Sequence, residues 1–120
     1  MAQEEKTMKN LLPACIIAFW ATGAIAHSPI DDTIPANEAV ISQVPSEVVL
    51  SFLHDIRLTR LTMTHADHPA ADLDLSGYKG MTTEYAVPMQ PMGNGTYVID
   101  WRGLGADGHA MNGTFSFTVE

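Results

Sequence analysis

Apolar and polar residues alternate along several short segments of this chain, and clusters of turn residues separate these segments. In residues 113–119, Phe115, Phe117 and Val119 fall on one face, and the residues between them are Ser or Thr. This period of two is typical of an antiparallel strand with one buried face. We expect further strands at residues 48–52, 57–64, 85–89 and 96–102. The strand at 85–89 contains Pro88, so we expect it at a sheet edge.

The same pattern predicts an all-β fold. After residue 26 no segment keeps a helical period over ten residues, and residues 64–83 are polar and rich in Gly and Asp. We expect that stretch to be a long loop with an irregular strand inside it, and residues 103–108 to be a Gly-rich loop. Five to seven short strands separated by turns favour a sandwich or a small barrel.

The segment at residues 96–102 carries the residues expected to anchor the core. Trp101 is the largest of them, and its neighbours Asp100 and Arg102 then point outward, because successive strand residues face opposite sides. Tyr97 shares the face of Trp101. We expect its ring to be buried while its hydroxyl stays in contact with water.

The first 26 residues have the layout of a secretory signal peptide. Lys6 and Lys9 precede an apolar run of eleven residues at 11–21, and Ala24 and Ala26 supply the small residues of a cleavage site. The run is shorter than the about 20 apolar residues that span a bilayer, and no later segment could span one either. We therefore expect cleavage after Ala26 and one exported domain at residues 27–120.

The chain is strongly acidic, with six Lys and Arg residues against 14 Asp and Glu residues and a formal net charge of −8. Residues 27–120 keep the same net charge, because the first 26 residues contain two charges of each sign. Such a balance disfavours nucleic acid and anionic membranes as partners and suits cations or basic protein faces, although an acidic surface also simply favours solubility. The single cysteine, Cys15, lies in the predicted signal, so disulfides and thiolate ligands are excluded from the domain.

Cleavage after Ala26 would make His27 the first residue, whose free α-amine and ring Nδ1 can together chelate a metal ion. Asp107 and His109 stand two apart, so in an extended segment they point the same way. One amine, two imidazoles and one carboxylate in a plane suit Cu(II). By spacing alone this is a weak signal, because D-x-H is common, and the pattern also fits a surface turn in which the aspartate caps the local backbone and the histidine is solvated.

Several short motifs follow one another along the domain. They read IPAN at 34–37, PSEVVLSF at 45–52, GTYVIDWR at 95–102, ADGH at 106–109 and GTFSF at 113–117. This succession, behind a histidine that directly follows a cleavage site, resembles the CopC family of periplasmic copper-resistance proteins. The resemblance covers essentially all of residues 27–120.

The resemblance implies a Greek-key β-sandwich or barrel of cupredoxin-like or immunoglobulin-like shape, with about seven strands. It also implies Cu(II) ligands at His27, Asp107 and His109. Two residues after Phe52, where many members of the family have a glutamate near the copper, this chain has His54. His54 is therefore a further candidate, as an extra ligand, as a partner of a ligand, or as a solvated histidine at a strand end.

Some members of the family hold Cu(I) in a methionine-rich loop, but the methionines of this chain are scattered. Met89 and Met92, with His65 or His68, are the candidates for such a site. Thioether sulfur suits Cu(I). Methionine is also a common filler of gaps in a core, so a structural role for these residues stays open.

Taken together, the resemblance implies a periplasmic protein that sequesters Cu(II) and passes it to a membrane or periplasmic partner, such as a CopD-like membrane protein. We expect a monomer that works by ligand exchange and is not an enzyme. One alternative is a copper-dependent oxidative enzyme built on the N-terminal histidine. Asp107 would fill the equatorial position that such an enzyme leaves open, and no aromatic row for a substrate is visible. Another alternative is a metal-free, immunoglobulin-like interaction module.

Overall fold

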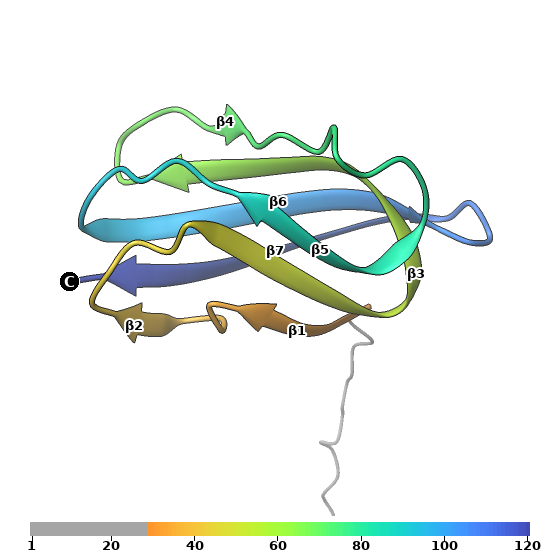
Figure 1. Cartoon of the computed structure of the whole chain (residues 1–120), viewed down its shortest axis with the longest axis horizontal. Helices are drawn as coiled ribbons and strands as arrows, with labels where there is room; N and C mark the ends of the chain where they lie inside the picture. Colours follow the sequence, from red (N-terminus) through yellow and green to blue (C-terminus); the bar gives the residue numbers. More distant parts are fainter. Residues whose placement is uncertain (1–28) are drawn as a thin grey trace, which may run out of the picture.

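The computed structural model describes residues 29–120, and the all-β prediction is confirmed (Figure 1). Seven strands form one curled sheet in the order β1-β3-β6-β7-β2, with β4 and β5 also paired to β3. Their bounds are β1 Ile30–Ile34, β2 Ala39–Ile41, β3 Glu47–His65, β4 Ala71–Asp72, β5 Thr82–Pro88, β6 Gly95–Gly105 and β7 Ala110–Val119. Within residues 29–120 no helix has the length and apolar character needed to cross a bilayer.

The long strand β3 belongs to both layers of the fold. Its first part pairs with β1 and β5, and its second part, from Ile56 onward, pairs with β6 and, near its end, β4. Figure 1 shows β3 turning back at the end of the molecule from which the β6–β7 connection protrudes. The sheet therefore curls over itself and encloses the core.

The sequence predicted two strands, at residues 48–52 and 57–64, where the structure has one. The cause lies at the bend, where Leu53, His54 and Asp55 are all exposed and interrupt the alternation. Three exposed residues in a row resemble a loop in the sequence, yet the backbone remains extended through them. The prediction of a break was therefore wrong, and His54 lies within a strand.

The core lies between the layers and is built from alternate strand residues. Phe115, Phe117 and Val119 are buried as predicted, and Trp101 is only 2% exposed. The ring of Phe52 meets the ring of Trp101 edge to face, with centroids 5.1 Å apart. Such a pair adds about 0.5–1.5 kcal/mol to the area that it buries. Phe52 precedes the bend of β3 and Trp101 lies on β6, so this contact joins the two layers.

The prediction that the Tyr97 hydroxyl stays in water was wrong. Tyr97 is fully buried, and its hydroxyl donates a hydrogen bond to the carbonyl of Gly93 at 2.6 Å. It also accepts one from the backbone N–H of Met92 at 2.9 Å. The loop before β6 thus satisfies the hydroxyl with backbone groups in place of water, as a buried polar group requires.

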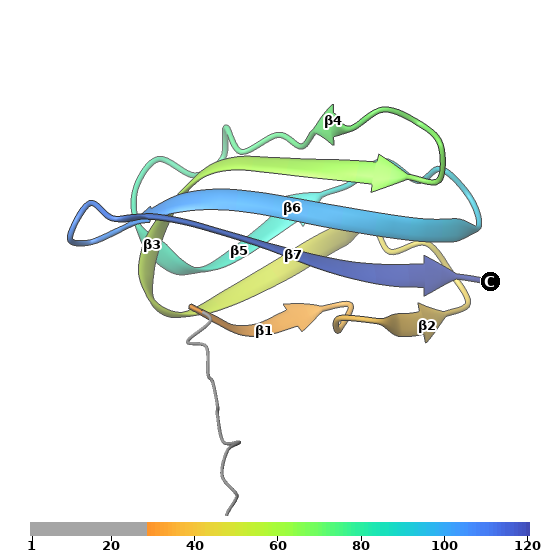
Figure 2. The ribbon, with the colours of Figure 1, turned by 180° about the vertical axis from the view of Figure 1, so that it is seen from behind.

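The strands β4, β5 and β6 agree with the expected order but not with all of the expected bounds, whereas β1 and β2 were not among the expected strands. Pro88 ends β5, which pairs only with β3 in the described part of the chain, and β4 is the short strand expected inside the long loop. The predicted loop at residues 103–108 is shorter, because Gly103 and Leu104 still pair with β7. A tight turn at residues 106–109 results, and Figure 2 shows it projecting from the body of the molecule.

Candidate metal centre

The turn between β6 and β7 brings Asp107 and His109 to the tip of a hairpin. The N–H of Gly105 donates to the carbonyl of His109 at 3.0 Å, and the N–H of Gly108 donates to the carbonyl of Gly105 at 2.9 Å. Gly108 has a φ of 84°, in the left-handed region where a side chain is strained. Glycine at this position therefore lets the turn close between the two functional side chains.

Asp107 and His109 are hydrogen bonded to each other, so the structure brings together the two residues that the spacing placed on one side. Oδ2 of Asp107 lies 2.7 Å from Nδ1 of His109, and Oδ1 accepts the backbone N–H of His109 at 3.0 Å. An ionised carboxylate only accepts, so Nδ1 carries a proton, and in the neutral ring Nε2 keeps a free lone pair. Metal-binding histidines are commonly oriented in this way. The hydrogen bond from the His109 backbone N–H to Asp107 would also be present in a surface turn that binds no metal.

The hydrogen bond shifts the protonation of both partners. The pKa of the Asp107 carboxyl is lowered, first by its hydrogen bond to the His109 ring and then by that to the His109 backbone. The pKa of His109 is raised, first by the hydrogen bond to Asp107 and then by the attraction of its charge. Because the pKa of His109 is higher in the folded state, protonation of His109 stabilises the fold. This stabilisation is complete below the ordinary pKa of histidine and is lost as the pH rises through the raised pKa. The contribution of Asp107 is lost as pH falls through its lowered value.

We expect His109 of the metal-free protein to titrate above the usual range for histidine. An NMR pH titration that follows the Cε1 proton of His109 measures this directly. Asp107→Asn removes the charge that holds the proton, so the pKa of His109 should fall back toward its ordinary value. A pKa of His109 that is unchanged by Asp107→Asn would show that the hydrogen bond does not form in solution.

A shallow, mostly apolar depression lies beside the hairpin and gathers three parts of the chain. These are the start of the described chain, the bend of β3 and the hairpin itself, and the residues that line it are Pro29, His54, Asp55, Ile56, Gly105, Ala106, Asp107 and Met111. The exposed side chain of His54 therefore lies on the same depression as Asp107. Ile56 pairs with Gly105 across β3 and β6, which explains why the bend and the hairpin meet.

Gly105 is a part of this centre that the sequence did not single out. A Cβ at this position would lie 2.6 Å from Cε of Met111 and 3.1 Å from Oδ1 of Asp107. Only its place in the Gly-rich run before Asp107 pointed to it. The missing side chain lets Met111 and the carboxylate of Asp107 pack closely over the strand.

His27, the third predicted ligand, lies outside the described residues. Within residues 29–120 no group of three or more His, Cys, Asp or Glu residues could hold a metal ion. Asp107 and His109 are thus two members of a predicted set of three, and His54 is the nearby addition.

The candidates for a second site lie at the opposite end of the sandwich. His65 pairs with Tyr97 near the start of β6, whereas Asp107 follows the end of that strand. Met89 belongs to the buried core, at 6% exposure, and Met92 is exposed. Met89 therefore has the structural role that the sequence left open.

His65 and His68 each have one ring nitrogen held by a backbone carbonyl. Nε2 of His65 lies 2.8 Å from the carbonyl oxygen of Asn94, and Nδ1 of His68 lies 3.0 Å from that of His65. Carbonyls only accept, so these nitrogens carry the protons. Nδ1 of His65 is buried without a hydrogen-bond partner in the described part of the chain. The ring centroids are 5.6 Å apart.

Comparison with known proteins places these observations in a family. The family model of the CopC domain matches residues 30–120. A copper resistance protein C of Escherichia coli is 27% identical over 125 residues, which cover 93% of this chain and 96% of that protein. A copper resistance protein C of Pseudomonas syringae pv. tomato is also 27% identical, over 81% of this chain and 83% of that protein.

Solved structures have the same fold as this chain. The crystal structure of CopC from Methylosinus trichosporium OB3b aligns with a TM-score of 0.65 at 22% identity, over 78% of this chain and 94% of that one. PcoC, described as a methionine-rich copper resistance protein from Escherichia coli, aligns with a TM-score of 0.55 at 26% identity. That alignment covers 79% of this chain and the whole of PcoC.

Proposed function

This chain belongs to the CopC family, and from that premise we propose that it is a periplasmic protein that binds Cu(II) through His27, Asp107 and His109. The relatives named above are copper resistance proteins. The observation that carries the proposal is the hydrogen-bonded pair of Asp107 and His109, which leaves Nε2 of His109 free at an exposed hairpin tip.

The position of His27 in the chain supports its part in the site. His27 precedes Pro29 by two residues, and Pro29 lines the same depression as Asp107. Two residues of extended chain span at most about 7 Å. Once the signal is removed after Ala26, the free amine of His27 would begin two residues before this depression, which supports a part for His27 in the site.

Each ligand has a distinct chemical part in this proposal. The amine and Nδ1 of His27 close a chelate ring, and Nε2 of His109 supplies a third nitrogen. Asp107 supplies the oxygen, and for this one of its two bonds to His109 is given up or shared with copper. Three nitrogens and one oxygen in a plane match the preference of Cu(II).

His54 is proposed as a neighbour of the bound copper, because it lines the depression next to Asp107. Its imidazole gives this chain a nitrogen donor in a place where a carboxylate would add negative charge.

Cu(I) is a second candidate cargo, at the opposite end of the molecule. Among the described residues, the buried Nδ1 of His65 and Nε2 of His68 have no hydrogen-bond partner, and each ring is fixed through its other nitrogen, which supports this candidate. Met92 is exposed at the same end and offers a thioether. Two imidazoles and one sulfur would suit Cu(I) better than Cu(II).

The proposed activity is capture and exchange of copper without turnover. A copper-binding monomer would protect the periplasm by sequestering the ion and handing it to a membrane or periplasmic partner, with a CopD-like protein as the expected recipient. Titration of residues 27–120 with Cu(II) against a competing chelator tests the binding. Tight binding of one equivalent supports the proposal, and weak binding of several equivalents would contradict it.

Gly105→Ala is expected to weaken Cu(II) binding about tenfold without unfolding the protein. The new Cβ would displace the flexible end of Met111 and push the carboxylate of Asp107 away from its present position. Gly77→Ala is the control, because a Cβ there meets no atom within 4 Å. Both variants are compared by competition titration and thermal unfolding. Equal copper affinities in the two variants would argue against a role for the Asp107 position.

A further inference from the structure

All four basic residues of the described chain lie along one stretch of its surface. Arg57 and Arg60 are exposed on β3, Arg102 is the cross-strand partner of Arg60 on β6, and Lys79 precedes β5. Arg57 and Lys79 line one hollow, and Arg60 and Arg102 line another. A third hollow shares Thr59 with the first and Arg60 with the second, and so joins them. We call Arg57, Arg60, Lys79 and Arg102 the basic band.

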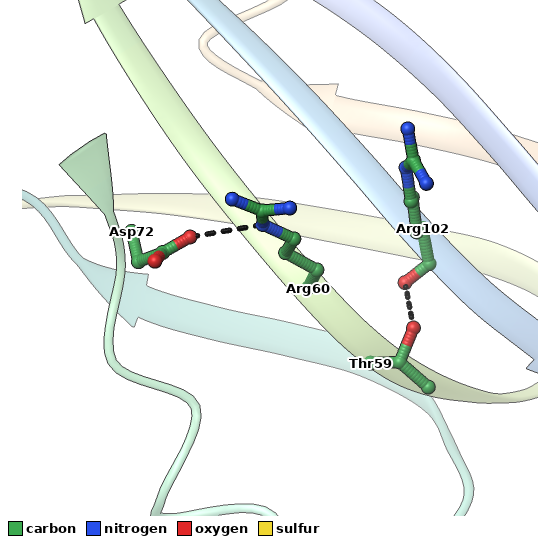
Figure 3. A network of polar contacts seen from close by, with 4 residues as sticks. All are labelled: Thr59, Arg60, Asp72 and Arg102. Atoms are coloured by element: carbon green, nitrogen blue, oxygen red, sulfur yellow. Dashed lines mark hydrogen bonds and ion pairs between the residues drawn. The ribbon is translucent and has the colours of Figure 1, made fainter. Parts of the chain in front are cut away.

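A bulge in β3 creates the arginine pair in this band. The pairing with β6 shifts between Leu58 and Arg60, and the residues on both sides of the bulge, Leu58 and Leu61, are buried. Thr59 and Arg60 both face outward as a result, because a bulge adds one residue to the strand. Figure 3 shows the hydroxyl of Thr59 donating to the carbonyl of Arg102, at 3.2 Å.

The two arginines differ in their partners. Nε of Arg60 donates to Oδ1 of Asp72 at 3.0 Å, whereas the guanidinium of Arg102 has no hydrogen bond or ion pair with any described residue (Figure 3). Like charges directly opposite each other destabilise a strand pair. Within residues 29–120 the guanidinium of Arg102 has no acceptor, so it is available to an acceptor from outside.

The rest of the surface has the opposite sign. Of the twelve Asp and Glu residues in the described chain, only Asp72 and Asp100 line the three hollows. The other ten lie outside them, where the described chain has no Lys or Arg. Most of the surface therefore repels an acidic partner, and only the basic band attracts it. We propose that the basic band docks a carboxylate-rich surface of a protein partner.

The chemistry of the band favours a protein over a membrane or a nucleic acid. None of the exposed large hydrophobic residues lines the three hollows, so the band has no apolar anchor for lipid. The planar fork of arginine binds a carboxylate or a phosphate through two parallel hydrogen bonds. The preference for a protein therefore rests on the net charge of −8, which repels an extended polyanion or an anionic membrane more strongly than a local group of carboxylates.

The band also reaches the metal centre. Arg57 pairs with Leu104, directly beside the pair of Ile56 and Gly105 that lines the depression. A partner held by its carboxylates would therefore sit next to the hairpin of Asp107. That this partner receives copper rests on the proposed function, but the docking itself does not.

An NMR titration of metal-free residues 27–120 with a deca-glutamate peptide at low salt tests the docking. We expect shifts of backbone amide signals around Arg57, Arg60, Lys79 and Arg102 that disappear at high salt. The double variant Arg57→Gln, Arg102→Gln should bind the peptide at least about fivefold more weakly. The control variant Gln43→Glu, Gln90→Glu lowers the net charge by the same amount at two exposed positions and should stay within about twofold.

Absence of binding, shifts spread over the whole surface, or equal losses in both variants would overturn the proposal. Tighter binding to vesicles of phosphatidylglycerol and phosphatidylcholine than to the peptide would overturn it in favour of a membrane. Amide spectra of the variants check that each remains folded. Because no copper is present, a failed docking experiment leaves the copper site untested, and a failed copper titration leaves the docking result intact.

Discussion

Acetylation of the His27 α-amine is expected to weaken Cu(II) binding by about a hundredfold or more, which corresponds to at least about 2.7 kcal/mol. The amide that replaces the amine is a far poorer ligand, and its formation opens the chelate ring with Nδ1. The imidazole of His27 remains, so any loss reports on the amine alone. Competition titration against a chelator of known affinity measures the change.

Lys79 provides the control for this experiment, because it is the only other amine in residues 27–120. Acetylated Lys79 with a free His27 amine should bind Cu(II) as tightly as the unmodified protein. If acetylation of His27 left the affinity unchanged, the N-terminal chelate would be wrong. The same result would remove the reason for linking copper binding to cleavage after Ala26.

The second large effect is expected for His109→Ala, which should also weaken Cu(II) binding by about a hundredfold or more. The substitution removes Nε2, the free nitrogen at the hairpin tip, and it leaves the carboxylate of Asp107 without its ring partner. The side chain of His109 is 82% exposed, so the melting temperature should hardly change. Affinity is measured by the same competition titration.

His68→Ala is the control for His109→Ala, because this histidine lies at the other end of the sandwich and is also exposed. It should leave the affinity of the Cu(II) site unchanged. A loss of equal size in both variants would mean that copper binds to surface histidines in general. That outcome would contradict a defined site at the hairpin.

The sequence predicted the strands wherever alternation was complete. Residues 113–119 are an example, since their apolar face became the buried face of β7. It failed at the bend of β3, where three exposed residues conceal a continuous strand. The predicted end of β6 was also too early. The glycines at 103 and 105 suggested a loop, but Gly103 still pairs with β7 and Gly105 still pairs with β3.

The same distinction applies to the candidate centre. Spacing alone placed Asp107 beside His109, because the effect is local to a turn. The neighbourhood of His54, Gly105 and Met111 depends on the pairing of Ile56 with Gly105, which joins distant parts of the chain. Likewise the hydroxyl of Tyr97 was expected in water, because a sequence does not show that the loop at Gly93 would cover it.

The basic band was hidden from the sequence for a similar reason. Arg60 and Arg102 face each other because of a bulge at Thr59, and a bulge leaves no clear pattern in the residues around it. Overall charge suggested only that basic faces of other proteins would be attractive. The arrangement of the four basic residues in the structure is the basis for proposing an acidic partner at one defined surface.

The most direct test of the copper site is electron paramagnetic resonance of residues 27–120 loaded with one equivalent of Cu(II). We predict a single tetragonal species with several nitrogen ligands, which is lost in His109→Ala. A mixture of weakly bound species, unchanged by His109→Ala, would contradict the proposal that His27, Asp107 and His109 form one copper site.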